Sequence, residues 1–217
     1  MIVIFDLDGT LLNTIDDLGY ACNYALQQVG YPTHPIDEYP AKVGDGINNL
    51  IRRALPEGER TEENILRVRA RFVPYYDAHN CDYTRPYAGI EELLHRLKEA
   101  GHSLAVASNK YQAATEKIVT HFFPGVFDVV LGERVGIARK PDPHIVFDIL
   151  STLIPQPSTL NLPHSTLYIG DSLVDWQTAQ NAGVPFIACS WGFVPREKLQ
   201  QAGVQTIVDH PDEIARQ

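Results

Sequence analysis

The stretch that decides the fold spans residues 2–10 and reads Ile2-Val3-Ile4-Phe5-Asp6-Leu7-Asp8-Gly9-Thr10. Its first four residues are apolar and mostly β-branched, which is typical of a short strand covered on both faces. Asp6 and Asp8 follow at the carboxyl end of this strand, where open α/β sheets place their ligands. Gly9 allows a tight turn, and the amides after it can point at an anion. A plain polar turn would also contain an Asp-x-Asp pair, but the five-residue pattern Asp-x-Asp-Gly-Thr arises by chance at only roughly 10⁻⁵ per starting position.

Short apolar runs of the same kind recur along the chain and alternate with helical patterns. The further predicted strands lie at 104–107, 129–131, 167–169 and 186–189. Between the strands, residues 91–98 place three leucines on one stripe, and Gly101 is expected to end that helix. Pro143 is expected to start another helix. Strands that alternate with helices imply βαβ crossovers, so the sequence predicts an α/β protein with an open parallel sheet.

The stretch from 15 to 83 breaks this alternation. Apolar residues fall there at helical spacing in three stripes, at 15–29, 47–55 and 65–72, and no strand-like run interrupts them. Thr14 is expected to cap the first of these helices. The sequence therefore predicts an all-helical domain inserted after the first strand. The expected domains are an α/β core of residues 1–14 and 84–217 and a helical cap of residues 15–83.

Two more polar clusters follow predicted strands. Ser108-Asn109-Lys110 comes after the second strand, and Gly170-Asp171-Ser172, with Asp175 close behind, comes after the fourth. Read alone, Ser108 or Asn109 is best explained as the N-cap of a helix at 111–121, and Asp171 as the cap of the helix that follows it. Lys140, within Arg139-Lys140-Pro141, is by itself best explained as a solvated loop charge.

Considered together, these clusters predict a single site. Parallel strands bring their carboxyl ends to one edge of the sheet, so the four aspartates of the clusters are expected to converge there. They would repel one another unless a hard cation lay among them. Mg²⁺ is the natural candidate, because it takes few carboxylates and keeps waters and phosphate oxygens as its other ligands. With Lys140 the set offers what phosphoryl transfer needs: a nucleophile, a metal, and donors for the equatorial oxygens.

In this order the clusters resemble the four motifs of the haloacid dehalogenase superfamily, over nearly the whole chain. The matching residues are Asp6-x-Asp8-Gly9-Thr10, Ser108-Asn109, Lys140-Pro141 and Gly170-Asp171-x-x-x-Asp175. The helical insert after the first motif is similar to the helical-cap subclass of that superfamily. The resemblance implies a Rossmann-like sheet in the order 5-4-1-2-3 with helices on both faces. It also disfavours dehalogenation, because members that cleave carbon–halogen bonds do not need an acid at the position of Asp8.

The resemblance implies a role for each motif residue. Asp6 would attack phosphorus in line to give an aspartyl phosphate, while Asp8 would protonate the leaving oxygen and then take a proton from the hydrolytic water. Lys140 would complete the catalytic set by neutralising phosphate charge and keeping Asp6 ionised. Mg²⁺ would be held by Asp6, the carbonyl of Asp8 and Asp171, with Asp175 ordering its waters. The phosphoryl group would be bound by Gly9, Thr10, Ser108, Asn109 and Lys140.

Within the superfamily the chain is most similar to the phosphoglycolate phosphatase group. This narrower match rests on Val43-Gly44-Asp45-Gly46-Ile47, Arg52-Arg53-Ala54-Leu55 and Ser108-Asn109-Lys110. Candidate substrate-contacting residues of the cap are Lys42, Gly44 and Arg53. The leading hypothesis is a Mg²⁺-dependent phosphatase of a small phosphate monoester, best 2-phosphoglycolate. A phosphomutase of sugar phosphates and a pyrophosphatase on the same core remain alternatives, whereas a phosphate-sensing receiver is disfavoured because receivers are much shorter and lack the insert.

Composition limits the partners. The 27 acidic side chains outnumber the 18 basic ones, for a formal charge of −9, which disfavours nucleic acid and anionic membranes. Three widely spaced cysteines suit a reducing compartment, and no basic signal region precedes Asp6. The uncharged stretch 149–170 contains three prolines, so it is expected to form a helix end, a loop at 155–164 away from the cleft, and a strand, not a membrane span. We expect a cytoplasmic protein, monomeric or homodimeric, that binds a small phosphorylated metabolite.

Overall fold

The computed structural model describes residues 1–154 and 166–216, and the statements below concern this part of the chain. The loop predicted at 155–164 lies outside the described residues. None of the described helices has both the length and the apolar composition needed to cross a bilayer.

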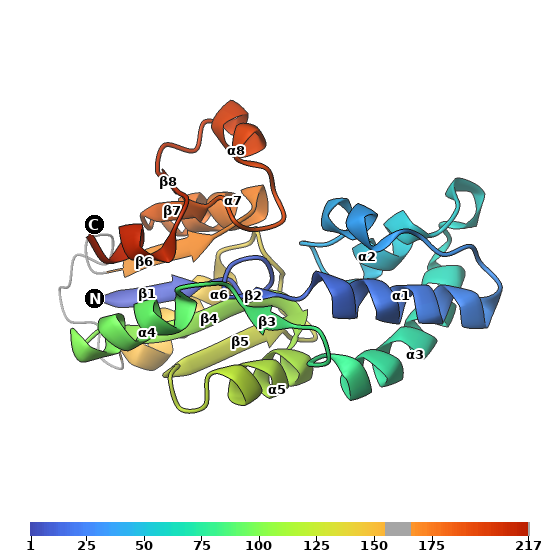
Figure 1. Cartoon of the computed structure of the whole chain (residues 1–217), viewed down its shortest axis with the longest axis horizontal. Coiled ribbons are helices and arrows are strands. Elements are labelled where there is room, and N and C mark those ends of the chain that lie inside the picture. Colours follow the sequence, from blue (N-terminus) through green and yellow to red (C-terminus); the bar gives the residue numbers. More distant parts are fainter. Residues whose placement is uncertain (155–165, 217) are drawn as a thin grey trace.

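A parallel sheet of six strands forms the centre of the molecule (Figure 1). Its order is β5-β4-β1-β6-β7-β8, with β1 hydrogen-bonded to β4 on one side and to β6 on the other. The strands are β1 (Ile2–Phe5), β4 (Ser103–Tyr111), β5 (Val129–Glu133), β6 (Thr166–Gly170), β7 (Phe186–Cys189) and β8 (Ile207–Val208). The predicted α/β class is confirmed.

The predicted order of five strands needs one correction. When the first five strands of this sheet are numbered along the chain, their order across the sheet is 5-4-1-2-3, as expected. A sixth strand, β8, extends the sheet beyond β7. β8 is not predicted from the sequence, because a strand of two residues is too short to produce a recognisable apolar run.

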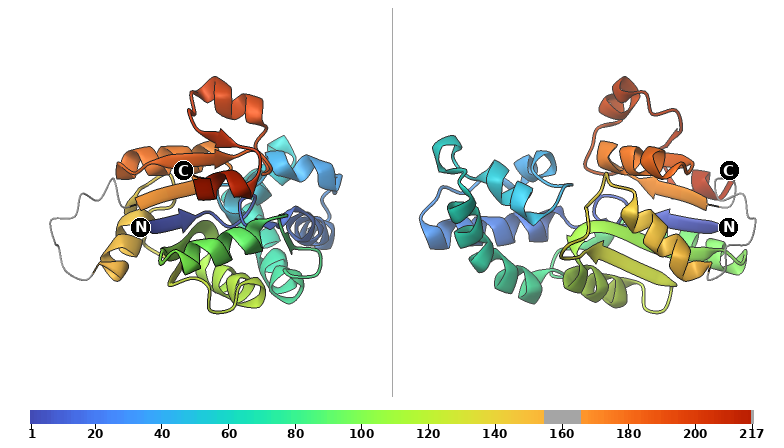
Figure 2. Two further views of the ribbon diagram at one scale, coloured as in Figure 1. Left: turned by 60° about the vertical axis from the view of Figure 1, so that its left-hand side comes forward. Right: turned by 180° about the vertical axis from the view of Figure 1, so that it is seen from behind.

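Side-chain alternation along β1 explains why the sheet is covered on both faces (Figure 2). Val3 and Phe5 share a core with α4 (Ile90–Glu99) and α5 (Gln112–Phe122), whereas Ile2 and Ile4 share the opposite core with α6 (His144–Leu153) and α7 (Leu173–Ala182). Successive residues of a strand point to opposite faces, so both sets must be apolar. The chain ends its described part with α8 (Arg196–Ala202) and the 3₁₀ helix η4 (Pro211–Arg216).

Residues 15–83 form a helical segment, which Figure 1 shows beyond the carboxyl end of β1. The long helices α1 and α3 pack against each other, and α2 packs on α3. Gly30 ends α1 in the left-handed conformation that glycine adopts readily. The elements of the segment are α1 (Ile15–Val29), η1 (Ile36–Ala41), α2 (Ile47–Ala54), η2 (Glu57–Glu59) and α3 (Glu62–His79).

Two short strands connect the helical segment to the rest of the chain. β2 (Leu12–Asn13) leads into it and β3 (Arg85–Pro86) leads out, and the two pair antiparallel. The buried carboxylate of Asp17 accepts hydrogen bonds from the backbone of Tyr83 and Thr84 and from the Thr84 hydroxyl. The two connections of the helical segment to the rest of the chain are therefore held side by side, and the first of them follows the Asp6–Thr10 turn directly.

The predicted helix caps are confirmed only in part. Thr14 lies at the N-cap position of α1, as expected, but its side chain makes no capping hydrogen bond because its hydroxyl donates to Asp8. Neither Ser108 nor Asn109 caps α5, since β4 continues through both to Tyr111. Asp171 does not cap α7 either: Ser172 does, in a reciprocal capping box with Asp175.

Candidate functional site

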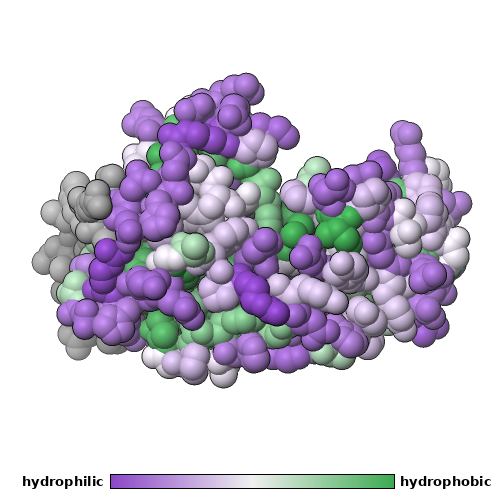
Figure 3. Space-filling view, in the orientation of Figure 1, coloured by the Kyte–Doolittle hydropathy of each residue, from purple (hydrophilic) through white to green (hydrophobic). Residues whose placement is uncertain are grey.

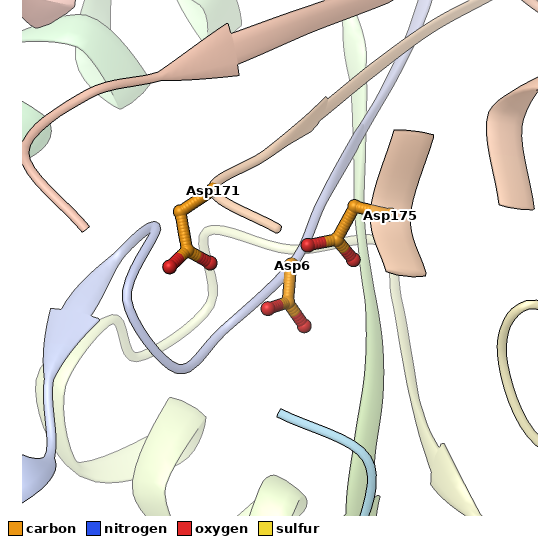
Figure 4. A group of neighbouring side chains, drawn as sticks. All are labelled: Asp6, Asp171 and Asp175. Carbon is orange, nitrogen blue, oxygen red and sulfur yellow. The ribbon is translucent and has the colours of Figure 1, made fainter. Parts of the chain in front are cut away.

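Three buried carboxylates, those of Asp6, Asp171 and Asp175, converge at the carboxyl ends of β1 and β6. One oxygen from each can be chosen so that all three lie within 4.8 Å of one another. Figure 4 shows the three side chains pointing toward a common space, Asp6 from the end of β1, Asp171 from the end of β6, and Asp175 from the first turn of α7. The structure thus brings together residues that are up to 169 positions apart in the chain (6 to 175).

The electrostatics of this cluster favour a cation. Burial, followed by the nearby charge of Asp175, raises the pKa of Asp6 well above its ordinary value. The same two causes raise the pKa of Asp171 to about 7. Both shifts indicate that the charged forms of these carboxyl groups are destabilised, because the protein alone does not compensate their negative charges.

The donor set fits Mg²⁺. Both oxygens of Asp175 are engaged: Oδ1 pairs with Lys140, and Oδ2 accepts from the backbone and the hydroxyl of Ser172. Asp6 uses Oδ1 for Lys140, and Asp171 uses Oδ2 to accept from the Phe193 backbone at 2.7 Å. Among the described residues the second oxygen of Asp6 has no hydrogen-bond partner, and that of Asp171 has only a long contact of 3.4 Å from the Thr10 hydroxyl, so both can serve a metal. Two carboxylates completed by waters or phosphate oxygens are the set that Mg²⁺ prefers.

Lys140 lies behind Asp6 and is almost fully buried. Its Nζ lies 2.7 Å from an oxygen of Asp6 and 2.7 Å from an oxygen of Asp175, and it also donates to the Ala107 carbonyl at 2.9 Å. Burial lowers the pKa of Lys140, but the two carboxylates outweigh it and hold that pKa well above its ordinary value. The structure thus places a fixed positive charge against Asp6, as the sequence analysis expected, but Lys140 does not line the pocket in front of Asp6.

Asp8 lies on the pocket wall beside Asp6. Its Oδ1 accepts from the Thr14 hydroxyl at 2.6 Å and lies 3.2 Å from the Nζ of Lys110. The Lys110 ammonium donates in turn to the hydroxyl of Tyr76, on α3, at 2.6 Å. The sequence pattern alone assigns Lys110 no role beyond its place in the Ser108-Asn109-Lys110 motif.

Ser108 and Asn109 occupy the pocket wall opposite Asp171 along the sheet edge. The Ser108 hydroxyl accepts from the Lys110 amide at 3.1 Å and keeps its own proton for another partner. The side chain of Asn109 exchanges hydrogen bonds with the backbone of Lys140, at 3.0 and 3.2 Å, and so fixes the loop that carries this lysine. Its amide group also approaches the carbonyl of Gly44 in the helical segment.

Two glycines allow the backbone to approach Asp171 closely. Gly9 has φ +87°, and a Cβ there would overlap the Asp171 carboxylate. Gly192 lies on the other side, where a Cβ would overlap both Asp171 and the Gly9 carbonyl. Thr10, fully buried, contacts Asp171 at 3.4 Å, and its carbonyl accepts from the indole of Trp191 at 3.0 Å. The Asp6–Thr10 turn and the loop after β7 therefore enclose Asp171 together.

Of the three candidate substrate residues in the helical segment, only Gly44 lines the pocket. Lys42 pairs with Glu38 at 3.0 Å. Arg53 makes two hydrogen bonds of 2.6 Å to the carboxylate of Asp45. The expectation that Lys42 and Arg53 reach the substrate is not supported by this arrangement, since both charges already have partners outside the pocket.

The wall that the helical segment contributes to the pocket is mainly apolar. Figure 3 shows the hollow between the sheet and the helical segment, with apolar surface on the side of the helices. The apolar lining residues from this segment are Leu18, Pro40, Val43, Ile47, Leu50 and Phe72. The pocket thus joins a strongly polar floor to an apolar roof.

Comparisons with known proteins agree on one family. The family model described as "Haloacid dehalogenase-like hydrolase" matches residues 3–189. A phosphoglycolate phosphatase from Cereibacter sphaeroides is 32% identical to this chain, in an alignment that covers 98% of this chain and 94% of the relative. A phosphoglycolate phosphatase from Rhodobacter capsulatus is 34% identical, in an alignment that covers 92% of this chain and 90% of the relative. A crystal structure assigned as a phosphoglycolate phosphatase from Lactobacillus delbrueckii subsp. bulgaricus superposes with a TM-score of 0.89 at 34% identity, covering 98% of this chain and 95% of that one.

Proposed function

Because the chain belongs to the haloacid dehalogenase-like hydrolase family and is a phosphoric monoester hydrolase, we propose a substrate and a mechanism for it. It hydrolyses 2-phosphoglycolate with Mg²⁺, through an aspartyl phosphate on Asp6. The observation that carries this proposal is the convergence of Asp6, Asp171 and Asp175 around a common space, with Lys140 bonded to Asp6. The arrangement supplies a nucleophile, a place for the metal, and a fixed cation in one pocket.

Each step of the reaction falls to a residue on the pocket floor. An oxygen of Asp6 attacks phosphorus in line, the bond to the leaving oxygen breaks, and Asp8 gives its proton to that oxygen. Asp8 then takes a proton from water, whose oxygen attacks the same phosphorus and returns Asp6 as a carboxylate. When bound, Mg²⁺ neutralises charge on the phosphoryl oxygens. Ser108 and the amide of Asn109 face these oxygens from the other side of the pocket, and Gly9 and Thr10 hold the turn that contacts Asp171.

The small size of the proposed leaving group suits the roof of the pocket. A site that selects a sugar phosphate needs hydrogen-bonding groups for the sugar hydroxyls. The roof residues Leu18, Ile47 and Phe72 offer none, and Tyr76 is the one described residue of the helical segment whose side chain brings a hydrogen-bonding group to the pocket. Curated relatives from two organisms carry the name phosphoglycolate phosphatase, which favours the same two-carbon substrate.

We also propose that residues 15–83 act as a separate cap domain over this floor. Their attachment through the paired strands β2 and β3 would let the segment open for substrate and close to exclude bulk water from the intermediate.

The test is a phosphate-release assay over 2-phosphoglycolate, pyrophosphate, sugar phosphates and nucleotides, with Mg²⁺ and with a chelator. We expect the highest kcat/KM for 2-phosphoglycolate, and loss of turnover in the chelator that added Mg²⁺ restores. Preference for pyrophosphate, or a need for a bisphosphorylated sugar activator, would replace the proposed function by the pyrophosphatase or the phosphomutase. Asp6→Asn serves as the catalytically dead control.

A further inference from the structure

One positive charge in the pocket is not used by the proposed mechanism. Among the described residues that line the pocket, Lys110 is the only lysine or arginine. Lys140 is bonded to carboxylates behind the floor, and the cationic residues Lys42 and Arg53 are paired elsewhere. An anionic group on the leaving side of a substrate would therefore find its cationic partner in Lys110.

The Lys110 ammonium is held in place from both parts of the molecule. Its Nζ lies 2.6 Å from the hydroxyl of Tyr76, 4.6 Å from the centre of the Tyr76 ring, and 3.2 Å from Oδ1 of Asp8. An ammonium has three N–H groups; the hydrogen bond to Tyr76 uses one, and the ion pair with Asp8 takes up at most a second. One donor thus remains for a ligand in the pocket. The Tyr76 hydroxyl accepts from Lys110 and so keeps its own proton for donation to the same ligand.

Orientation of Asp8 does not by itself explain this lysine. The Asp8 carboxylate already accepts a 2.6 Å hydrogen bond from the buried Thr14 hydroxyl. A lysine that is only 8% exposed also carries a desolvation cost, which one carboxylate and one aromatic ring offset in part. A second anion in the pocket would complete the compensation.

We propose that Lys110, supported by Tyr76, binds a carboxylate on the leaving alcohol and so makes the enzyme select phosphate esters of small hydroxy acids. This inference rests on the proposed function. Asp8 contacts the leaving oxygen in that mechanism, and in 2-phosphoglycolate a single methylene separates this oxygen from the carboxylate. The carboxylate therefore comes next to the group that Asp8 touches, where Lys110 and Tyr76 lie.

The experiment compares two esters of equal length, 2-phosphoglycolate and 2-hydroxyethyl phosphate, whose leaving alcohol carries no charge. The measured quantity is the ratio of their kcat/KM values, in which differences of intrinsic reactivity cancel between variants. A charged hydrogen bond contributes about 1.5–3 kcal/mol, so Lys110→Met is expected to lower the ratio by about 10- to 100-fold, mainly through the KM of the acid. Lys110→Arg, which keeps the charge, should retain most of the preference, and the exposed Lys198→Met is the matched control.

The outcomes separate this inference from the proposed function. A wild-type enzyme that hydrolyses 2-hydroxyethyl phosphate but not 2-phosphoglycolate overturns the proposed function and the inference with it. A wild-type preference for the acid that Lys110→Met leaves unchanged overturns the inference alone. If Lys110→Met is inactive on both esters, Tyr76→Phe decides: it is expected to lower the ratio severalfold, and an unchanged ratio overturns the role of the pair.

Discussion

Replacing Lys140 by methionine tests the electrostatic design of the pocket floor most directly. Methionine keeps the length of the side chain and removes only the charge and its donors. The loss leaves Asp6 and Asp175 in a buried space, each without the ammonium that now lies at 2.7 Å. The hydrogen bond to the Ala107 carbonyl is lost as well.

The size of the effect follows from these contacts. At 2.7 Å, each pair has a Coulomb energy of about 6 kcal/mol at an effective dielectric constant of ~20, most of which offsets the desolvation of the buried charges. Removing one partner of a buried ion pair costs about 3–5 kcal/mol. Because Lys140 serves two carboxylates, we expect about 5 kcal/mol in the absence of metal, and less with Mg²⁺, which supplies positive charge to the same cluster.

The assay is urea denaturation of the metal-free proteins in a chelator at pH 8, with Lys98→Met as the matched control. Lys98 pairs with Asp128 at 3.0 Å, but both side chains are more than one third exposed, so its removal should cost less than about 1 kcal/mol. A double-mutant cycle with Asp175→Asn should give a coupling free energy of about 1–3 kcal/mol. The reasoning is refuted if Lys140→Met loses no more stability than Lys98→Met, or if the cycle shows no coupling.

Four further predictions concern the rest of the site. Asp6→Asn should abolish turnover of every ester, and appreciable residual activity would contradict the covalent route. The pKa of Asp171 is about 7 in the folded protein and ~4 in the unfolded chain, so between these values only the folded state holds the proton. The free energy of unfolding of the metal-free wild type, relative to that of Asp171→Asn, should therefore fall as the pH rises from about 4 to 7. Urea denaturation at several pH values measures this difference. Gly192→Ala should displace the loop after β7 from Asp171 and weaken Mg²⁺ binding in calorimetric titration, whereas Gly58→Ala, where a Cβ meets open space, should not. Arg53→Ala should change kcat/KM by less than about threefold, because Arg53 does not line the pocket; a larger change would show that the cap rearranges on binding.

The floor of the site could be predicted from sequence because its residues follow strands directly. An apolar run such as Ile2–Phe5 indicates a buried strand, and parallel pairing then brings the residue after each strand to a common edge. This reasoning places Asp6 near Asp171 without any knowledge of side-chain packing, and the structure agrees.

Local pairing of charges explains why Lys42 and Arg53, two candidate substrate residues of the helical segment, do not line the pocket. Glu38 lies four residues before Lys42, and this spacing was available in the sequence as a sign of an ion pair. The pairing of Arg53 with Asp45 joins a helix to the loop before it, and no regular spacing predicts such a contact.

Lys110 shows where sequence reasoning stops. Its place on the pocket wall depends on β4 continuing through Ser108 to Tyr111, whereas the sequence favoured a helix start there. The pairing of β4 with β5 is irregular between Ala107 and Tyr111, so strand alternation does not predict which side chains of this stretch line the pocket. The contact with Tyr76 could not have been found in this way, because it requires α3 of the helical segment to lie over the end of β4. The residues at the strand ends thus indicate the chemistry of the pocket floor from sequence alone. The proposed selectivity depends instead on the contact between Lys110 and Tyr76, which forms only because the helical segment packs against the sheet.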